Sequence, residues 1–277
     1  MDRLIAFSRR YGSDPELTVA GGGNTSMKEN GVLYVKGSGV SLGTIRREGF
    51  VALDMKKLLV IPEKAYPENE TEREAAVLAD TLAARLPGQE RRPSVETLLH
   101  ALFPQRYVLH LHPNLVNGLT CARNGKEAAK KLFPDVPWVP AGRPGYPLAI
   151  ALREQVVGGA DTILLQNHGV FFAADTPEQL EEMLRHMLSI LEKAIAENYD
   201  SDADVPPTPE KPFTPDQIVY CGLGKEPADT PVSRLLWEGT KKVARYTAAF
   251  GGPCPMTEEM IDFITHWEAE SYRIKQL

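Results

Sequence analysis

The spacing of apolar residues predicts alternating strands and helices over the first two hundred residues. Short apolar runs bounded by glycine, proline or polar residues predict strands at 31–36, 50–61, 106–113 and 161–173, and the run at 50–61 has possible helical content. The last run is expected to be a pair of strands with a turn at Asn167-His168-Gly169. Apolar residues at helical spacing predict helices over 2–11, 69–86, 93–103 and 115–132.

Turn and capping residues mark the boundaries between these elements. The stretch 17–28 is expected to be a glycine-rich turn running into polar residues, and 134–147 a proline-rich loop. Thr176-Pro177-Glu178-Gln179 fits a capping box, with Thr176 as the N-cap, and therefore predicts the start of a long amphipathic helix.

The pattern changes near residue 200. The stretch 200–215 is acidic and holds five prolines between Pro206 and Pro215, which is typical of a linker. Two further helices are expected at about 231–250 and 257–275. We therefore expect three parts: a mixed body over 1–199, a linker over 200–215 and a helical C-terminal extension over 216–277.

Composition narrows the class of protein. Among 277 residues, 43% are hydrophobic and 25% charged, which is typical of a globular protein. A net charge of −6 argues against nucleic acid as a partner. Three scattered cysteines without a CxxC pair indicate a reducing compartment, and no apolar run reaches the ~18 residues that a membrane span requires. We expect a cytoplasmic protein that binds neither nucleic acid nor membrane.

Three histidines form the first candidate site. His110 and His112 lie two apart in a predicted strand, so both side chains point to one face and could chelate one metal ion. His168 follows the apolar run at Thr162–Leu165, where it is either a third ligand or a turn histidine without a partner. Three imidazoles with an open fourth position suit catalytic zinc, although cobalt or manganese could occupy such a site.

Glu96 is the second candidate. It lies in the first turn of a predicted helix, where a carboxylate either stabilises the helix dipole or, near a metal, acts as a general base. His100 lies four residues later on the same helix face. It could orient Glu96 or could simply pack in the core.

Two turns are the third candidate. GGGNTS at 21–26 and KGSG at 36–39 can present backbone N–H groups and hydroxyls to an anion, and Ser94 at a helix start could add to them. The alternative is that the glycines serve only hairpin turns. Neither turn matches the Rossmann or Walker A spacing, so nucleotide binding is not indicated.

In this order (GNTS, GSG, S-x-E, H-x-H, NHG), the motifs resemble the class II aldolase/adducin family over roughly residues 1–199. The resemblance implies an α/β/α sandwich with a central, mainly antiparallel sheet. It implies zinc on His110, His112 and His168 and acid/base catalysis by Glu96. It also implies a substrate phosphate pocket formed by Asn24, Ser26, Ser38, Gly39 and Ser94, and a tetramer with active sites between subunits.

A narrower resemblance is carried by 110–125, 144–149 and 213–222, which look like the aldolase half of bifunctional rhamnulose-phosphate aldolase/alcohol dehydrogenases. Two departures stand out. Many family aldolases have two adjacent serines before the glutamate, whereas this chain has Ser94-Val95-Glu96. The tyrosine that a neighbouring subunit commonly supplies as proton donor has no matching motif, and Tyr220 and Tyr272 are the candidates in the extension.

The expected function is a zinc-dependent aldolase that cleaves a ketose 1-phosphate of the rhamnulose or fuculose type to dihydroxyacetone phosphate and an aldehyde. An epimerase, dehydratase or decarboxylase could use the same site. A non-catalytic, adducin-like interaction domain is the alternative from another class, and it would be expected to lack the metal ligands. The expected assembly is a cyclic homo-oligomer, a tetramer, and the expected partner is a phosphorylated sugar.

Overall fold

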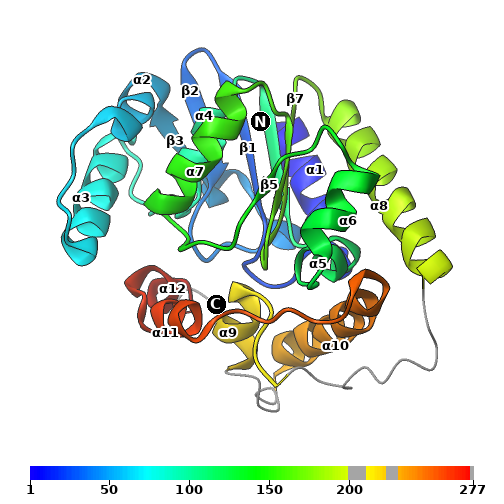
Figure 1. Cartoon of the computed structure of the whole chain (residues 1–277). Helices are drawn as coiled ribbons and strands as arrows, with labels where there is room; N and C mark the ends of the chain where they lie inside the picture. The colour runs from blue at the N-terminus through cyan, green and yellow to red at the C-terminus, as the bar shows by residue number, and fades with distance from the viewer. Residues whose placement is uncertain (199–209, 223–229, 275–277) are drawn as a thin grey trace.

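A seven-stranded sheet forms the centre of the computed structural model, which describes residues 1–198, 210–222 and 230–274 (Figure 1). The strand order is β3-β2-β1-β4-β7-β6-β5, and all neighbours are antiparallel except β5 and β6. The strands are β1 (Asn24–Glu29), β2 (Val32–Lys36), β3 (Phe50–Asp54), β4 (Tyr107–Leu111), β5 (Trp138–Val139), β6 (Thr162–Leu165) and β7 (Gly169–Ala174).

Helices cover both faces of this sheet. One face carries α1 (Asp2–Gly12), α5 (Asn114–Thr120), α6 (Gly125–Leu132) and α8 (Pro177–Asn198). The other carries α2 (Met55–Leu59), α3 (Glu70–Ala83), α4 (Thr97–Leu102) and α7 (Tyr146–Val157). Short 3-10 turns are η1 (Leu42–Thr44), η2 (Arg47–Gly49), η3 (Ile61–Glu63) and η4 (Ala248–Phe250). The predicted α/β/α sandwich with a mainly antiparallel sheet is confirmed.

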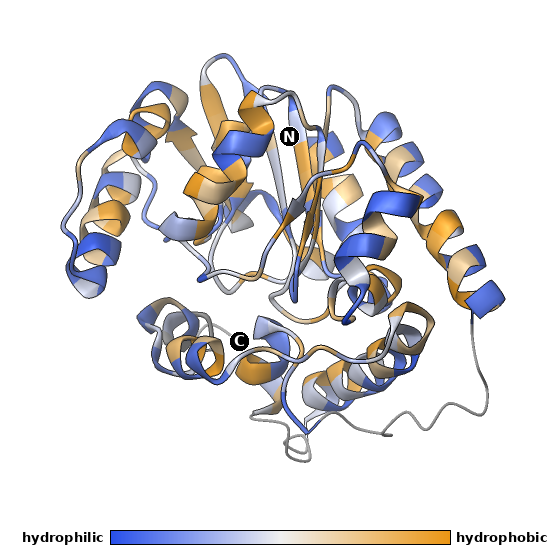
Figure 2. Ribbon diagram, in the orientation of Figure 1, coloured by the Kyte–Doolittle hydropathy of each residue, from blue (hydrophilic) through white to orange (hydrophobic). Residues whose placement is uncertain are grey.

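The two layers of helices divide the apolar core in two. In β4, Leu109 and Leu111 point to the core beneath α1 and α8, whereas Val108 points to the core beneath α4 and α7. Figure 2 shows the apolar strands at the centre and helices whose polar residues face outward. Because β4 is covered on both faces, any polar side chain on it must find a partner inside the protein.

The first strand of the sheet was not predicted. β1 begins at Asn24, inside the stretch that the sequence indicated as a turn. Its polar residues are satisfied internally: the Thr25 hydroxyl lies 2.7 Å from that of Ser8, and the Ser26 hydroxyl lies 2.8 Å from Nδ1 of His100. A strand whose buried positions are polar lacks the alternation that identifies strands in a sequence.

Three other boundaries differ from prediction. The helix expected over 115–132 is two helices, because the chain turns between Cys121 and Asn124. The proline-rich loop 134–147 contains β5, which extends the sheet by one short parallel strand. Helices α7 and α9 were not predicted.

Four helices follow the sandwich: α9 (Pro215–Cys221), α10 (Pro231–Thr247), α11 (Glu258–His266) and α12 (Glu268–Ile274). They lie together against one end of the sheet (Figure 1). α10 packs closely on α5, where an ideal Cβ on Gly118 would lie 2.4 Å from Cβ of Tyr246. Most of the predicted linker, 200–209, lies outside the described residues, so its role as a linker stays a prediction.

All three cysteines are free thiols. No helix within the described segments combines the length and the apolar character that crossing a membrane would require.

Candidate active site

Three histidine side chains meet at the end of the sheet that faces α9 and α12. His110 lies in β4, His112 just after it, and His168 in the turn between β6 and β7. One ring nitrogen from each lies within 4.8 Å of the others, and Nε2 of His110 is 2.9 Å from Nε2 of His112. The three imidazoles that the sequence singled out are therefore brought together.

The turn that carries His168 depends on its two neighbours. Asn167 has a φ of +56°, and its side-chain amide donates to the carbonyl of Cys254 at 2.8 Å. Gly169 has an ordinary φ, so the turn does not depend on the conformational freedom of a glycine at this position. It allows a close approach instead: a Cβ there would lie 2.2 Å from the carbonyl oxygen of Leu111 and 2.9 Å from the ring of His112.

Hydrogen bonds orient two of the rings. Nδ1 of His110 donates to the carbonyl of Val170 at 3.0 Å, and the ring stacks on Phe171 at 4.1 Å between centroids. Nδ1 of His112 donates to the carboxylate of Asp216 at 2.5 Å. In a neutral ring this donation from Nδ1 leaves Nε2 unprotonated, and here the two Nε2 atoms face one another. Such contacts commonly fix the tautomer and orientation of metal-binding histidines.

Glu96 reaches the same point from the opposite side. It is the N-cap residue of α4, but its carboxylate makes no capping hydrogen bond. Instead Oε1 lies 3.0 Å from Nε2 of His110 and 3.5 Å from Nε2 of His168, and Oε2 accepts from the Asn24 amide at 3.4 Å. Helix-dipole stabilisation alone does not account for a carboxylate directed into three imidazoles.

The site is largely buried, which affects the charge of its groups. Burial favours the neutral acid, yet the neighbouring imidazoles, His110 foremost, hold the pKa of Glu96 well below its usual range. Burial, followed by the charges of His110 and His112, lowers the pKa of His168 to about 3. At neutral pH the site therefore presents an ionised carboxylate and a neutral His168.

These features fit a divalent metal ion. Nε2 of His110 lies 2.9 Å from Nε2 of His112 and 3.0 Å from Oε1 of Glu96, and one bound cation could accept lone pairs from both nitrogens. Three histidine nitrogens with an open position are the ligand set of many catalytic zinc sites. Imidazole also suits other transition metals, so the donor set does not choose between zinc, cobalt and manganese.

A small cavity of about 30 Å³ adjoins the histidines, and the second glycine turn forms part of its wall. Ser38, Gly39 and Ser94 line it, together with Glu96 and Lys36. Lys36 is only 3% exposed, and its ammonium group donates to the carbonyl of Gly21 at 2.6 Å. The cavity thus combines hydroxyl groups with one buried lysine side chain.

Asn24 and Ser26 lie apart from this cavity wall. Asn24 is fully buried beside His110 in the sheet, and its amide faces Glu96. The Ser26 hydroxyl faces His100, which is also fully buried and packs edge-on against Phe171. His100 therefore contacts Ser26 rather than Glu96, as the packing alternative expected.

Two residues of the site were missed by the sequence analysis. Asp216 lies next to the predicted linker, in a Thr-Pro-Asp-Gln stretch where an acidic residue is expected merely to favour the start of a helix. Lys36 is the first residue of KGSG, and only the glycines and serine of that turn were given a role. The signal for Lys36 was present: a lysine closing an apolar strand, immediately before a glycine turn.

Comparison with known proteins places this fold and site in context. The family profile described as "Class II Aldolase and Adducin N-terminal domain" matches residues 2–195. A solved structure from Thermoplasma acidophilum, described as an N-terminal class II aldolase domain of a conserved protein, is 31% identical. It has a TM-score of 0.62 and covers 70% of this chain and 92% of its own.

Two further relatives are informative. "Uncharacterized oxidoreductase YuxG" of Bacillus subtilis (strain 168) is 32% identical over 216 residues, which is 73% of this chain. This chain spans only 30% of that protein. A structure titled L-fuculose 1-phosphate aldolase has a TM-score of 0.50 and 17% identity, and covers 74% of this chain and 89% of its own. The likeness to that aldolase is one of fold.

Proposed function

This chain belongs to the class II aldolase and adducin family, and we propose that it is a metal-dependent aldolase that cleaves a ketose 1-phosphate. The products would be dihydroxyacetone phosphate and an aldehyde, as with substrates of the rhamnulose or fuculose 1-phosphate type. The observation that carries the proposal is the convergence of three imidazoles beside an ionised, buried glutamate. A non-catalytic domain would have no use for this arrangement.

His110, His112 and His168 would hold the metal, which we propose is zinc. When bound, a divalent metal is a Lewis acid that polarises a carbonyl oxygen. Asp216 and the Val170 carbonyl keep two of the imidazoles in the tautomer that leaves Nε2 unprotonated. The protein thereby fixes the ligand set before the metal arrives.

Glu96 would move the proton at the reacting carbon. Its carboxylate is ionised, excluded from bulk water and held by Asn24, which are the conditions that a positioned general base needs. In the condensation direction Glu96 would take a proton from the carbon that forms the new bond, while the aldehyde oxygen gains a proton from the neighbour's tyrosine. In the cleavage direction the substrate hydroxyl loses its proton as the carbon–carbon bond breaks, and protonated Glu96 would return a proton to that carbon.

The small cavity would bind the phosphate. Ser38, Gly39 and Ser94 line it and would offer hydroxyl and backbone donors, and Lys36 would add a positive charge. Asn24 would act through Glu96 and Ser26 through His100, so neither would touch the phosphate directly. A sugar phosphate is therefore the partner that this cavity favours.

We also propose a cyclic homotetramer in the cytoplasm, in which a neighbour completes the site. Tyr220 is only 9% exposed within α9, so it is a poor donor to another subunit. Tyr272 is partly exposed and lies under the guanidinium group of Arg92 at 4.7 Å, so it is the better candidate. Light scattering tests the assembly, and a fully active monomer would contradict it.

A substrate panel tests the reaction. The zinc-loaded protein is incubated with rhamnulose 1-phosphate, fuculose 1-phosphate and their unphosphorylated sugars, and dihydroxyacetone phosphate and aldehyde are measured. We expect cleavage of a phosphorylated ketose, and loss of cleavage after chelation of the metal. Release of water or carbon dioxide, or an epimerised sugar, would instead identify a dehydratase, decarboxylase or epimerase that uses the same residues.

A further inference from the structure

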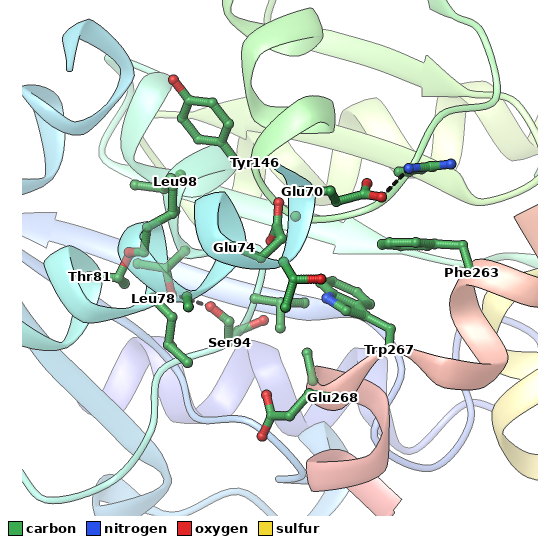
Figure 3. Close-up of a pocket in the computed structure, with 18 of the residues that line it drawn as sticks. Glu70, Glu74, Leu78, Thr81, Ser94, Leu98, Tyr146, Phe263, Trp267 and Glu268 are labelled. Atoms are coloured by element: carbon green, nitrogen blue, oxygen red, sulfur yellow. Dashed lines mark hydrogen bonds and ion pairs between the residues drawn. The ribbon is translucent and has the colours of Figure 1, made fainter. Parts of the chain in front are cut away.

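A large cavity lies beside the histidine site and is separate from the proposed reaction. Its volume is about 660 Å³, within the range of pockets that bind small organic molecules. It lies between α3, the segment before α4, and helices α11 and α12. Figure 3 shows its walls, with Leu78 and Thr81 from α3 on one side and Phe263 and Trp267 from the C-terminal helices on the other.

This cavity adjoins the small cavity at the histidines. Ser94, Val95 and Ala269 line both, so these residues lie between the two spaces. The small cavity has a volume of about 30 Å³, which is far too little for a whole sugar phosphate. The remainder of a substrate could therefore occupy the large cavity, on the other side of Val95 and Ala269.

Val95 places an apolar side chain between the two cavities. It stands where many family aldolases have a second serine, and that replacement removes a hydroxyl from the phosphate side of the site. In the structure Val95 is half-buried and lines the large cavity as well as the small one. An apolar side chain there continues an apolar wall, which explains the departure from the serine.

Most of the remaining wall is apolar or aromatic. Its larger contributors are Leu78, Leu98, Tyr146, Phe263 and Trp267. Their rings and alkyl groups would bury an apolar portion of a ligand, at about 25 cal/mol for each Å² removed from water.

The charged groups of the cavity disfavour an anion. Two arginines line it, but Arg143 pairs with Glu70 and Glu259, and Arg92 pairs with Glu268. With Glu74 and Asp262, the wall has five carboxylates against these two guanidinium groups.

Glu74 is the polar group best placed to bind a ligand. It accepts a hydrogen bond from the backbone N–H of Tyr146, while its Oε1 atom is buried and has no hydrogen-bond partner within the described segments. Burial raises the pKa of this carboxyl. A ligand hydroxyl in the cavity could donate to Oε1, whereas a ligand carboxylate or phosphate would be repelled.

We propose that this cavity is a second substrate subsite, which takes an uncharged, largely apolar group bearing a hydrogen-bond donor, and that Val95 and Ala269 form its connection to the histidine site. The identity of the occupant as part of the substrate rests on the proposed function. The binding chemistry of the cavity does not. A substrate that fits both cavities has its anionic group near Lys36 and a bulkier, uncharged group beyond Val95.

The test uses two probes of nearly equal shape, 4-phenyl-1-butanol and 4-phenylbutanoate, titrated into the metal-loaded full chain by calorimetry. We expect saturable binding of the alcohol at one site and at least tenfold weaker binding of the carboxylate. Glu74→Gln should reduce the difference in affinity between the alcohol and the carboxylate, because it removes a negative charge and keeps the size and shape of the side chain. Equal binding of both probes, or no saturable binding of the alcohol, would overturn the proposal.

A matched pair of variants locates the site. Ala75 and Ala79 are both exposed on α3, one turn apart, but only Ala75 lines the cavity. We expect Ala75→Trp to weaken binding of the alcohol at least tenfold and Ala79→Trp to leave it unchanged, with metal content equal in both. Equal effects of the two substitutions would place the alcohol elsewhere and refute the assignment.

Competition then links the cavity to the substrate. The alcohol should raise KM for the ketose phosphate that the panel identifies. Binding of the alcohol without turnover of any sugar would refute the proposed function and leave a binding site. Turnover that the bound alcohol does not affect would refute the subsite and leave the aldolase.

Discussion

The carboxylate of Asp216 accepts a hydrogen bond from Nδ1 of His112 at 2.5 Å, although the two residues lie 104 positions apart. Both side chains are almost fully buried, at 9% exposure for His112 and 5% for Asp216. Asp216 comes from α9, in the C-terminal extension, and His112 from the end of β4. The extension therefore supplies a residue that orients a histidine of the candidate metal site, which gives it a role beyond covering the sheet.

Asp216→Asn should weaken metal binding while leaving the fold intact. The amide cannot hold the imidazole in one tautomer as a carboxylate does, and loss of such a partner typically costs about 10–100-fold in metal affinity. The measurement is competition for zinc against a chelator, with circular dichroism as the check on folding. Asp262→Asn is the control, because Asp262 is 79% exposed on α11. Equal zinc affinity in wild type and Asp216→Asn would show that the contact is only structural.

Glu96→Gln should retain the metal and lose turnover. The amide preserves the size of the side chain and its contact with Asn24, but it cannot accept a proton. A positioned acid or base is worth about 10²–10⁴-fold in rate. Metal content and kcat are measured on the same sample, since loss of metal would instead make Glu96 a ligand. Unchanged kcat would assign the glutamate to helix stabilisation alone.

Lys36→Gln should raise KM for a phosphorylated substrate much more than for the same sugar without phosphate. A hydrogen bond to a charged group contributes about 1.5–3 kcal/mol, which corresponds to a rise of about tenfold or more. Ser38→Ala should act in the same direction and less strongly, since a neutral hydroxyl contributes less. A parallel loss on both sugars would show that Lys36 supports the turn through Gly21 rather than the phosphate.

The sequence predicts those site residues that lie close to one another along the chain or within a short motif. It does not predict those that only folding brings to the site. His110 and His112 lie two residues apart at the end of one strand, and His168 and Glu96 each belong to a short motif. Asp216 lies in the stretch 213–222 that carries the narrower resemblance, but no role could be given to it, because its role depends on where α9 docks. β1 was missed for a related reason: its buried polar residues are satisfied by Ser8 and His100, which only the folded chain brings near.

Gly169→Ala should disturb the metal site through its backbone. The new Cβ would lie 2.2 Å from the carbonyl oxygen of Leu111, so the start of β7 or the end of β4 must shift. His168 lies next to the first of these positions and His112 next to the second. Overpacking of this kind typically costs about 1–3 kcal/mol in unfolding free energy. The free energy of unfolding, measured with denaturant, and the affinity for zinc should both fall. Gly142→Ala is the control, because its nearest neighbour would be 3.8 Å away; a loss as large in that variant would exclude close approach as the cause.

Lys28→Met should stabilise the protein most at low pH. Burial lowers the pKa of Lys28 to about 7, whereas that of an unfolded lysine is about 10.4. Between these two pH values the unfolded state therefore binds more protons than the folded state. The destabilisation caused by Lys28 is greatest below pH 7, and it disappears as the pH rises toward 10. Urea unfolding at pH 6, 8 and 9.5 should show the gain of Lys28→Met over wild type shrinking along the series. Lys193→Met, at an exposed position on α8, should show a constant difference. A gain for Lys28→Met that does not change with pH would mean that its ammonium group remains charged in the folded protein.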